Sequence, residues 1–249
     1  MQTPQDKAHK PAWPTGNDVN RLSIVILLLL LAIASAVFVI SPDIDTKIAA
    51  YFYVGQNKFS AQTSLGKMGR VFFYTVPFLA LAAYLFAYAA ARLGKSLHFA
   101  PSLRETAFVA LTMALGPGLL VNLTLKDHMH RPRPAHLQAF GGPMEFRPFY
   151  KTDGACPKNC AFPSGEASAS FWLVAPALLT PPLWRAPAIA AAMVFGAATG
   201  LLRMAFGGHF LSDVIFAALI TLLLIGLFWR AFFGWGQRPA QSSNTPSSA

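Results

Sequence analysis

Long apolar runs, separated by short polar segments, are the feature that most restricts how this chain can fold. Residues 22–40 form a run of 19 residues without a charged side chain. A helix that rises about 1.5 Å per residue would cross the hydrocarbon core of a bilayer, about 30 Å thick, over this length. In the whole chain 54% of the residues are hydrophobic and only 12% are charged, unlike soluble domains. The sequence therefore predicts an integral membrane protein.

The apolar part of the chain, residues 22–235, should form one all-α domain. A chain of 249 residues without an internal repeat has the size of a single helical bundle. We expect a six-span transmembrane bundle, with spans at 22–40, 71–91, 105–125, 165–181, 186–203 and 212–233. Gly196 and Gly200 in the fifth span would allow a neighbouring helix to approach closely. The flanking segments 1–21 and 236–249 are polar and are predicted to be mobile tails.

The first apolar run has a second interpretation. Ala34, Ser35 and Ala36 follow a leucine-rich stretch and resemble a signal-peptidase site. We favour an uncut membrane anchor, because the apolar stretch continues beyond these residues. Cleavage would leave the rest of the topology unchanged.

The distribution of basic residues bears on orientation and on partners. An even number of spans places both termini on one side of the membrane, but the totals of Lys and Arg on the two sides are too similar to decide which. The loop 92–104 has three basic residues and no acid, and segment 1–21 has three more, which favours a cytoplasmic position for both. The net charge of +10 is spread over helix ends and loops. We therefore predict an anionic ligand and no nucleic-acid partner.

The chain has two cysteines, Cys156 and Cys160, in the long polar loop at about 126–164. This loop should face the side opposite the termini, the periplasm if the membrane is a bacterial inner membrane. A pair at this spacing outside the cytoplasm favours a local disulfide. A zinc site is the alternative, with His128, His130 and His136 nearby, but no familiar ligand spacing is present. We predict no metal.

Three polar clusters lie where apolar runs begin or end, and one of them contains Arg203, His209 and Asp213. Arg203 closes the fifth run, and the other two residues open the sixth on one helical face. The carboxylate could then accept a hydrogen bond from one ring nitrogen and leave the other free to attack phosphorus. Alternatively, Asp213 is an ordinary acid in the first turn of a helix.

A second cluster follows the third run, with Lys126 and then Arg133 before Pro134. An ammonium and a planar guanidinium together suit the oxygens of a phosphoryl group. Taken alone, these residues favour a basic belt at the lipid headgroups. We assign Arg131 to such a belt, because it precedes Pro132 rather than Pro134 and does not have the spacing from Lys126 that Arg133 has.

The third cluster consists of Pro163, Ser164, Gly165 and Glu166 at the start of the fourth run. A Ser-Gly pair that opens a helix presents a hydroxyl group and free backbone N–H groups to an anion. Taken alone, the cluster favours simple capping, with Ser164 as the N-cap and Glu166 as a first-turn acid.

Read together, the clusters have the pattern Lys-x6-Arg-Pro, Pro-Ser-Gly and Arg-x5-His-x3-Asp. This pattern resembles the type 2 phosphatidic acid phosphatase (PAP2) family, which shares its site with bacterial acid phosphatases and vanadium haloperoxidases. The resemblance runs from Lys126 to Asp213, and the six-span layout extends it to nearly all of the chain. It implies a metal-independent phosphatase without a cofactor, acting at the outer face of the membrane.

The resemblance also implies a role for each matching residue. His209 would be the nucleophile that forms a phosphohistidine, and Asp213 would orient it. The remaining residues would bind the phosphate: Lys126, Arg133, Ser164, Gly165 and Arg203.

The chain departs from the family at Glu166, because the second motif normally ends in a histidine that protonates the leaving group. A carboxyl group at a dry interface could donate a proton, but the nearby cations would oppose its protonation. Glu166 is therefore either the acid or a group that positions water or the substrate. In the second case His128, His130 or no side chain would protonate the leaving group. A retained fold without activity is a further alternative.

A site at the outer ends of membrane helices would receive a phosphate at headgroup depth, so the sequence predicts a lipid phosphate substrate. The Pro-Ser-Gly-Glu variant and the loop from Phe140 to Cys160 resemble the lipid A phosphatase branch. Two alternatives stay open. A phosphotransferase would pass the same phosphohistidine to an acceptor other than water. A transporter or scaffold would only bind anionic headgroups, but it should carry polar groups at mid-membrane depth.

Overall fold

The computed structural model of the chain describes residues 16–95 and 100–234. The predicted tails lie outside this part, except that α1 begins within the segment assigned to the first tail. In chain order the elements are α1 (Gly16–Ile40), α2 (Asp43–Ala50), β1 (Tyr53–Gly55), β2 (Lys58–Phe59), α3 (Ser64–Arg92), α4 (Leu103–Met113), η1 (Ala114–Leu125), α5 (Lys126–His128), η2 (Pro134–His136), η3 (Gln138–Phe140), α6 (Gly165–Phe171), α7 (Val174–Leu178), α8 (Pro182–Ala205) and α9 (Leu211–Phe233).

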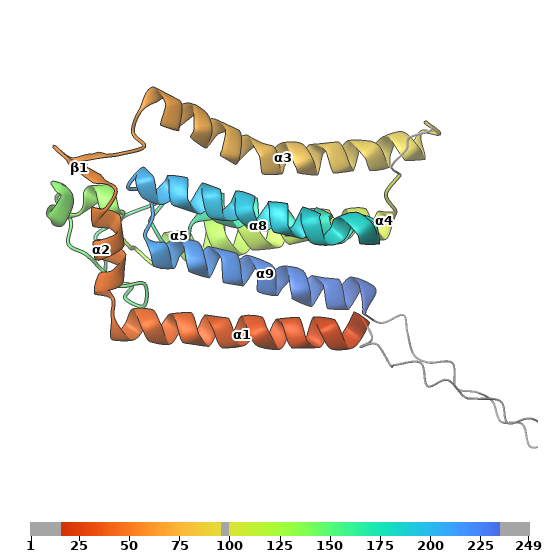
Figure 1. Cartoon of the computed structure of the whole chain (residues 1–249), viewed down its shortest axis with the longest axis horizontal. Helices are drawn as coiled ribbons and strands as arrows, with labels where there is room; N and C mark the ends of the chain where they lie inside the picture. Colours follow the sequence, from red (N-terminus) through yellow and green to blue (C-terminus); the bar gives the residue numbers. More distant parts are fainter. Residues whose placement is uncertain (1–15, 96–99, 235–249) are drawn as a thin grey trace, which may run out of the picture.

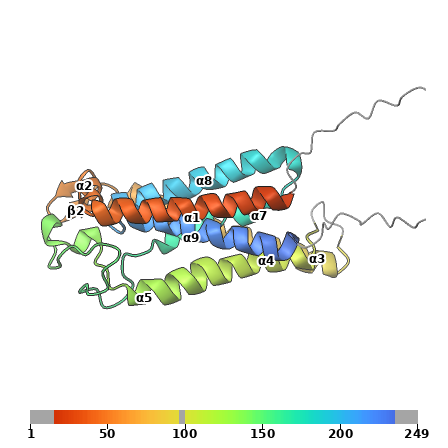
Figure 2. The same cartoon turned by 90° about the horizontal axis from the view of Figure 1, so that it is seen from below.

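Long helices lie roughly side by side along one axis and form a single bundle (Figures 1 and 2). Five stretches in the described part are long and apolar enough to cross a membrane: Arg21–Ile40, Ser64–Arg92, Leu103–His128, Pro182–Ala205 and Leu211–Phe233. In each of the first two stretches, only 11% of the most apolar 18-residue segment is buried inside the protein. Their exposed apolar side chains are suited to lipid rather than to water. The predicted all-α membrane bundle is confirmed.

The fourth predicted span does not form one long helix, so the prediction of six continuous spans is not confirmed. Residues 165–181 instead form α6 and α7, which pack against α8 and α9. Pro176 has no N–H to donate to the carbonyl of Trp172, which accepts a bond from the Ala175 amide at 2.8 Å instead. Every residue of α6 except Glu166 is buried. This apolar segment therefore belongs to the interior of the bundle and not to its lipid-facing surface.

The third predicted span is one continuous helix with a change of winding. After α4 the backbone becomes a π-helix, η1, which contains Pro117. The side chains of Asn122 and Thr124 donate to carbonyls five residues earlier, those of Pro117 at 2.7 Å and Leu119 at 3.0 Å. π-Helical turns frequently occur at functional sites. Here the segment leads directly to Lys126.

A short helix and a hairpin that were not predicted lie at the same end of the bundle. Helix α2 runs across the ends of the long helices rather than along them (Figure 1). The hairpin of β1 and β2 follows and pairs Tyr53 with Phe59. The Phe59 side chain is buried against Phe140, with ring centroids 5.5 Å apart. This packing holds the hairpin against the long polar loop. We call this end of the bundle the loop end.

The centre of the bundle is organised around Trp172, whose side chain is fully buried. Its indole N–H donates to Thr112 Oγ1 at 3.0 Å, which provides the polar partner that a buried indole needs. The predicted close approach of helices at the fifth run is also confirmed. A Cβ atom would lie 2.4 Å from the ring of Phe171 at Gly196 and 2.3 Å from Val214 at Gly200. The short helix α6 and helix α9 therefore pack directly on the backbone of α8.

Candidate active site

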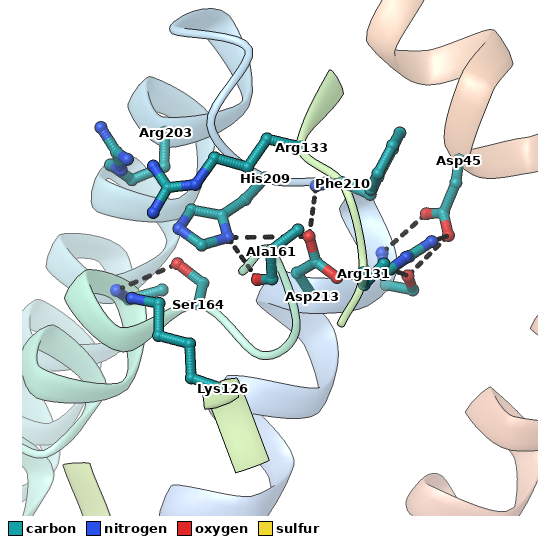
Figure 3. A network of polar contacts seen from close by, with 12 residues as sticks. Asp45, Lys126, Arg131, Arg133, Ala161, Ser164, Arg203, His209, Phe210 and Asp213 are labelled. Carbon is teal, nitrogen blue, oxygen red and sulfur yellow. Dashed lines mark hydrogen bonds and ion pairs between the residues drawn. The ribbon is translucent and has the colours of Figure 1, made fainter. Parts of the chain in front are cut away.

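The three sequence clusters meet at the loop end of the bundle (Figure 3). Lys126 follows η1, Ser164 caps α6, Arg203 lies in the last turn of α8, and His209 lies between α8 and α9. Arg133 enters from the long loop. Residues separated by up to 83 positions in the sequence thus surround one space.

His209 is held in one tautomer by a backbone carbonyl. Its Nδ1 atom lies 2.7 Å from the carbonyl oxygen of Ala161, and the side chain is only 1% exposed. Because a carbonyl only accepts, Nδ1 carries the proton and Nε2 of the neutral ring has a free lone pair. The ring lies between Arg133 and Ser164, with Nε2 on the side away from Ala161 (Figure 3). This nitrogen is placed to act as a nucleophile.

Burial also keeps the imidazole neutral. Loss of solvation lowers the pKa of His209 to about 4, the nearby Arg203 and Arg133 also lower it, and Asp213 opposes the shift. The ring is therefore unprotonated at neutral pH, as a nucleophile must be.

Asp213 contacts the imidazole less closely than the sequence interpretation expected. Its Oδ2 atom lies 3.6 Å from His209 Nδ1, which is too long for a hydrogen bond. The carboxylate instead accepts a bond from the Phe210 N–H at 2.7 Å and pairs with Arg131. Asp213 therefore provides a negative charge beside the ring, while Ala161 fixes its tautomer.

The assignment of Arg131 to a lipid-facing belt is wrong. Its side chain is fully buried and pairs with Asp213 and with Asp45, the latter at 2.7 Å. Ser212 completes the network, since its hydroxyl donates to Asp45 Oδ2 at 2.6 Å and its backbone N–H donates to Asp45 Oδ1 at 2.9 Å. The two carboxylates, which come from α2 and α9, explain why this arginine lies inside rather than in the headgroup layer.

Arg133 and Lys126 are each oriented by an asparagine. Nη2 of Arg133 donates to the carbonyl of Asn159 at 2.8 Å and to its side-chain oxygen at 3.0 Å. Nζ of Lys126 lies 3.4 Å from Oδ1 of Asn122. Neither asparagine was identified from the sequence, although Asn122 precedes Lys126 by one helical turn in an otherwise apolar run.

Ser164 and Gly165 form the start of α6 as predicted. The hydroxyl oxygen of Ser164 accepts the Ala167 N–H at 3.4 Å, and its own N–H donates to the Asp213 carbonyl at 3.1 Å. At Gly165 a Cβ atom would lie 2.2 Å from Oδ1 of Asn122. A larger residue here would force the Asn122 side chain, which contacts Lys126, to move away from the helix start.

Glu166 lies between two arginines, one of which was missed. Arg70 on α3 donates to Glu166 Oε1 from Nη2 at 2.7 Å and from Nε at 3.2 Å. Arg203 Nε lies 3.4 Å from Oε2, close enough for an ion pair, but without hydrogen-bond geometry. Arg70 could have been noticed as a charged residue at the start of an apolar run. Two neighbouring cations favour the ionised form of Glu166.

The structure joins Cys156 and Cys160 by a disulfide, with their Cα atoms 5.8 Å apart. These cysteines are therefore not available as zinc ligands. Within residues 16–95 and 100–234, no three His, Cys, Asp or Glu side chains are grouped to hold a metal ion. The positively charged side chains around His209 are those of Lys126, Arg133 and Arg203 (Figure 3).

The fold is that of a membrane protein, and a cluster of cations beside a neutral histidine is suited to phosphoryl chemistry. Comparison with known proteins agrees. Residues 105–237, which contain all three motifs, match the PAP2 superfamily. A lipid A 4′-phosphatase of Francisella tularensis subsp. novicida is 34% identical over 211 residues, covering 82% of this chain and 92% of that protein. A lipid A 4′-phosphatase of Rhizobium leguminosarum is 39% identical over 113 residues, covering 45% and 48%.

A solved structure has the same fold. The transmembrane PAP2-type phosphatidylglycerolphosphate phosphatase of Bacillus subtilis superposes with a TM-score of 0.56 at 20% identity, covering 87% of this chain and 98% of that one. The chain belongs to the PAP2 superfamily. The predicted family is confirmed, and the protein is a multi-pass membrane lipid phosphatase.

Proposed function

We propose that this protein hydrolyses the 4′-phosphate of lipid A through a phosphohistidine at His209, at the outer face of the bacterial inner membrane. The observation that carries the mechanism is the hydrogen bond from His209 Nδ1 to Ala161, which leaves Nε2 unprotonated beside the cations. The relatives described above support the choice of substrate.

In the first step, Nε2 attacks phosphorus and the bond from phosphorus to the sugar oxygen breaks. Lys126, Arg133 and Arg203 stabilise the charge on the phosphoryl oxygens, with Ser164 and the N–H of Gly165 completing the cradle. The imidazole becomes cationic, and the negative charge of Asp213 stabilises it. The leaving alkoxide takes a proton from water, because Glu166 is held ionised by Arg70 and Arg203. In the second step, water attacks the phosphohistidine, which releases phosphate and restores the neutral ring.

The proposed orientation of the protein in the membrane rests on the residues found at the two ends of the bundle. The loop end carries the disulfide, which is typical of an oxidising compartment. The opposite end carries Arg92 at the end of α3 and Arg104 at the start of α4. The Arg104 guanidinium lies 5.1 Å from the centre of the Phe233 ring, at the end of α9 far from His209. Basic residues at this end favour a cytoplasmic position for it. The active site would then face the periplasm.

Purified protein and defined lipids would test the proposed function. We expect lipid A that carries both phosphates to lose one, with free phosphate as the second product, in the presence of EDTA. Mass spectrometry with fragmentation would identify the phosphate that is lost. Loss of the other phosphate would contradict the 4′ assignment, and a phosphorylated acceptor without free phosphate would favour a phosphotransferase. Abolition of turnover by EDTA, with recovery on adding a divalent ion, would contradict the metal-independent mechanism.

The rate should depend on pH as expected for a nucleophile with a lowered pKa. Below about pH 4 the folded protein protonates His209 and removes its lone pair, so kcat/KM should fall as pH decreases through this value. The second ionisation of a phosphomonoester, near pH 6, gives a separate limb. Two soluble substrates with different second pKa values would distinguish the two limbs of the pH profile. The limb that reports the substrate should shift with the substrate's pKa, and the limb that reports His209 should not. A fixed limb near pH 6.5 would instead indicate an ordinary histidine.

The Glu166→Gln substitution should slow phosphate esters with good and poor leaving groups to a similar extent, by about tenfold. The reason is that Glu166 orders Arg70 and Arg203 and does not donate a proton. Rates with an aryl phosphate and an alkyl phosphate would be compared. A much larger loss with the alkyl phosphate would identify Glu166 as the acid for the leaving group.

A further inference from the structure

The short loop closed by Cys156 and Cys160 touches two parts of the active site. Within the loop, Asn159 accepts three hydrogen bonds from Arg133, two on its carbonyl oxygen at 2.8 and 3.2 Å and one on Oδ1 at 3.0 Å. Immediately after the loop, the carbonyl of Ala161 accepts the bond from His209. One segment of chain therefore contacts both the phosphate-binding arginine and the nucleophilic histidine.

The loop has a defined conformation. Asn159 has a φ of 53°, in the left-handed region that asparagine tolerates better than most residues. Its N–H donates to Asp127 Oδ1 at 3.3 Å, and the N–H of Ala161 donates to the Arg131 carbonyl at 2.8 Å. The side chain of Cys160 is fully buried. Contacts on both sides and the disulfide thus hold the loop against the segment 127–131.

The contacts with Asn159 leave one end of the Arg133 guanidinium for a ligand. Nε and Nη2 point to Asn159, and the Nη1 end is not engaged by it. A guanidinium binds phosphate through a planar fork of N–H donors. Fixing one edge of this fork therefore orients the rest of it.

The disulfide is poorly suited to stabilising the whole protein, because it closes a ring with a sequence separation of only four residues. A short ring restricts the unfolded chain much less than a long one. Its main effect is on local geometry, and the local geometry here is that of the active site.

We propose that the disulfide-closed loop is the element that positions Arg133 relative to His209, and that Asn159 is a positioning residue for phosphate binding. This inference rests on the proposed function. Loss of the Oδ1 acceptor weakens the hold on Arg133 alone, so it raises KM more than it lowers kcat. Loss of the disulfide releases the Ala161 carbonyl as well, so it also lowers kcat.

The test uses the full-length protein in detergent or lipid, with direct binding of inorganic phosphate by calorimetry and turnover of a soluble phosphomonoester. Asn159→Ala should weaken phosphate binding by about tenfold, the effect of one charged hydrogen bond. Asn159→Asp keeps the acceptor and should restore binding to within about threefold. Asn57→Ala, at another asparagine with positive φ, controls for backbone strain and should leave binding unchanged.

The double variant Cys156→Ala with Cys160→Ala should fold and bind phosphate at least about tenfold more weakly, with a lower kcat. A folded double variant with unchanged phosphate affinity and kcat would overturn the proposal. Equal losses in Asn159→Ala and Asn159→Asp would remove Asn159 from its positioning role. If the unmodified protein binds phosphate but releases none from any ester, the proposed function fails, and the binding series still decides the role of the loop.

Discussion

Replacement of His209 by alanine should reduce the release of phosphate by at least about 10⁴-fold while the protein remains folded. The magnitude is typical of the loss of a covalent nucleophile. The cations of the site stay in place, so inorganic phosphate should still bind with an affinity close to that of the unmodified protein. Turnover of a soluble phosphomonoester and calorimetry of phosphate binding would measure the two effects separately.

The covalent intermediate provides a second readout of this variant. Samples of the unmodified protein stopped with alkaline detergent during turnover of labelled substrate should contain protein-bound phosphate that is stable in base and lost in acid, as expected for phosphohistidine, and the His209→Ala protein should not. Retention of the label in the variant would assign the nucleophile to another residue. Thermal unfolding of both proteins checks that a loss of turnover does not reflect misfolding.

The residues of the candidate active site could be predicted because each belongs to a short motif at the end of an apolar run. Arg133, Ser164 and His209 were selected from local spacing, and the structure brings them together. Most of the residues that orient them were missed because their contacts are distant in the sequence, and Asn122, one helical turn before Lys126, is the exception. Arg70 and Glu166 are separated by 96 positions, and Asp45 and Ser212 by 167. No local pattern reports such pairs.

For the fold, too, the sequence predicted local features, the apolar segments, but not how these segments pack against one another. Hydropathy locates apolar segments, but it does not distinguish a helix that faces lipid from one buried among other helices. The segment 165–181 was therefore predicted as one continuous helix, whereas it forms two short helices, α6 and α7, in the interior of the bundle. Helix α2 was missed because it is only 8 residues long and charged side chains interrupt its short apolar pattern. Its importance lies in Asp45, which reaches the buried network beneath the site.

The buried network explains how the site keeps a negative charge beside His209. Arg131 is one cation between two carboxylates, Asp45 and Asp213, so the three groups carry a net charge of −1 when ionised. Burial raises the pKa of Asp45, and the charge of Arg131 opposes this shift. The excess negative charge would favour the cationic imidazole of the proposed phosphohistidine.

Replacement of Arg131 by methionine should lower the free energy of unfolding by about 3–5 kcal/mol, the cost of removing one partner from a buried ion pair. The variant leaves two carboxylates buried without a cation, and the Phe210 ring loses the guanidinium that lies 4.4 Å from its centre. Thermal or denaturant unfolding in detergent would measure the loss. Arg131→Lys keeps the charge but loses the planar fork, so its loss should be intermediate.

Arg147→Met is the matched control from the same loop. The Arg147 side chain is 33% exposed and pairs with the exposed Glu145 at 3.0 Å, and such surface pairs contribute about 0–1 kcal/mol. Adding Asp45→Asn to Arg131→Met should recover part of the lost stability, because it neutralises one of the two uncompensated carboxylates. If Arg131→Met and Arg147→Met destabilise the protein equally, or if Asp45→Asn adds a further loss to Arg131→Met, the network does not hold α2 to the active site through charge pairing.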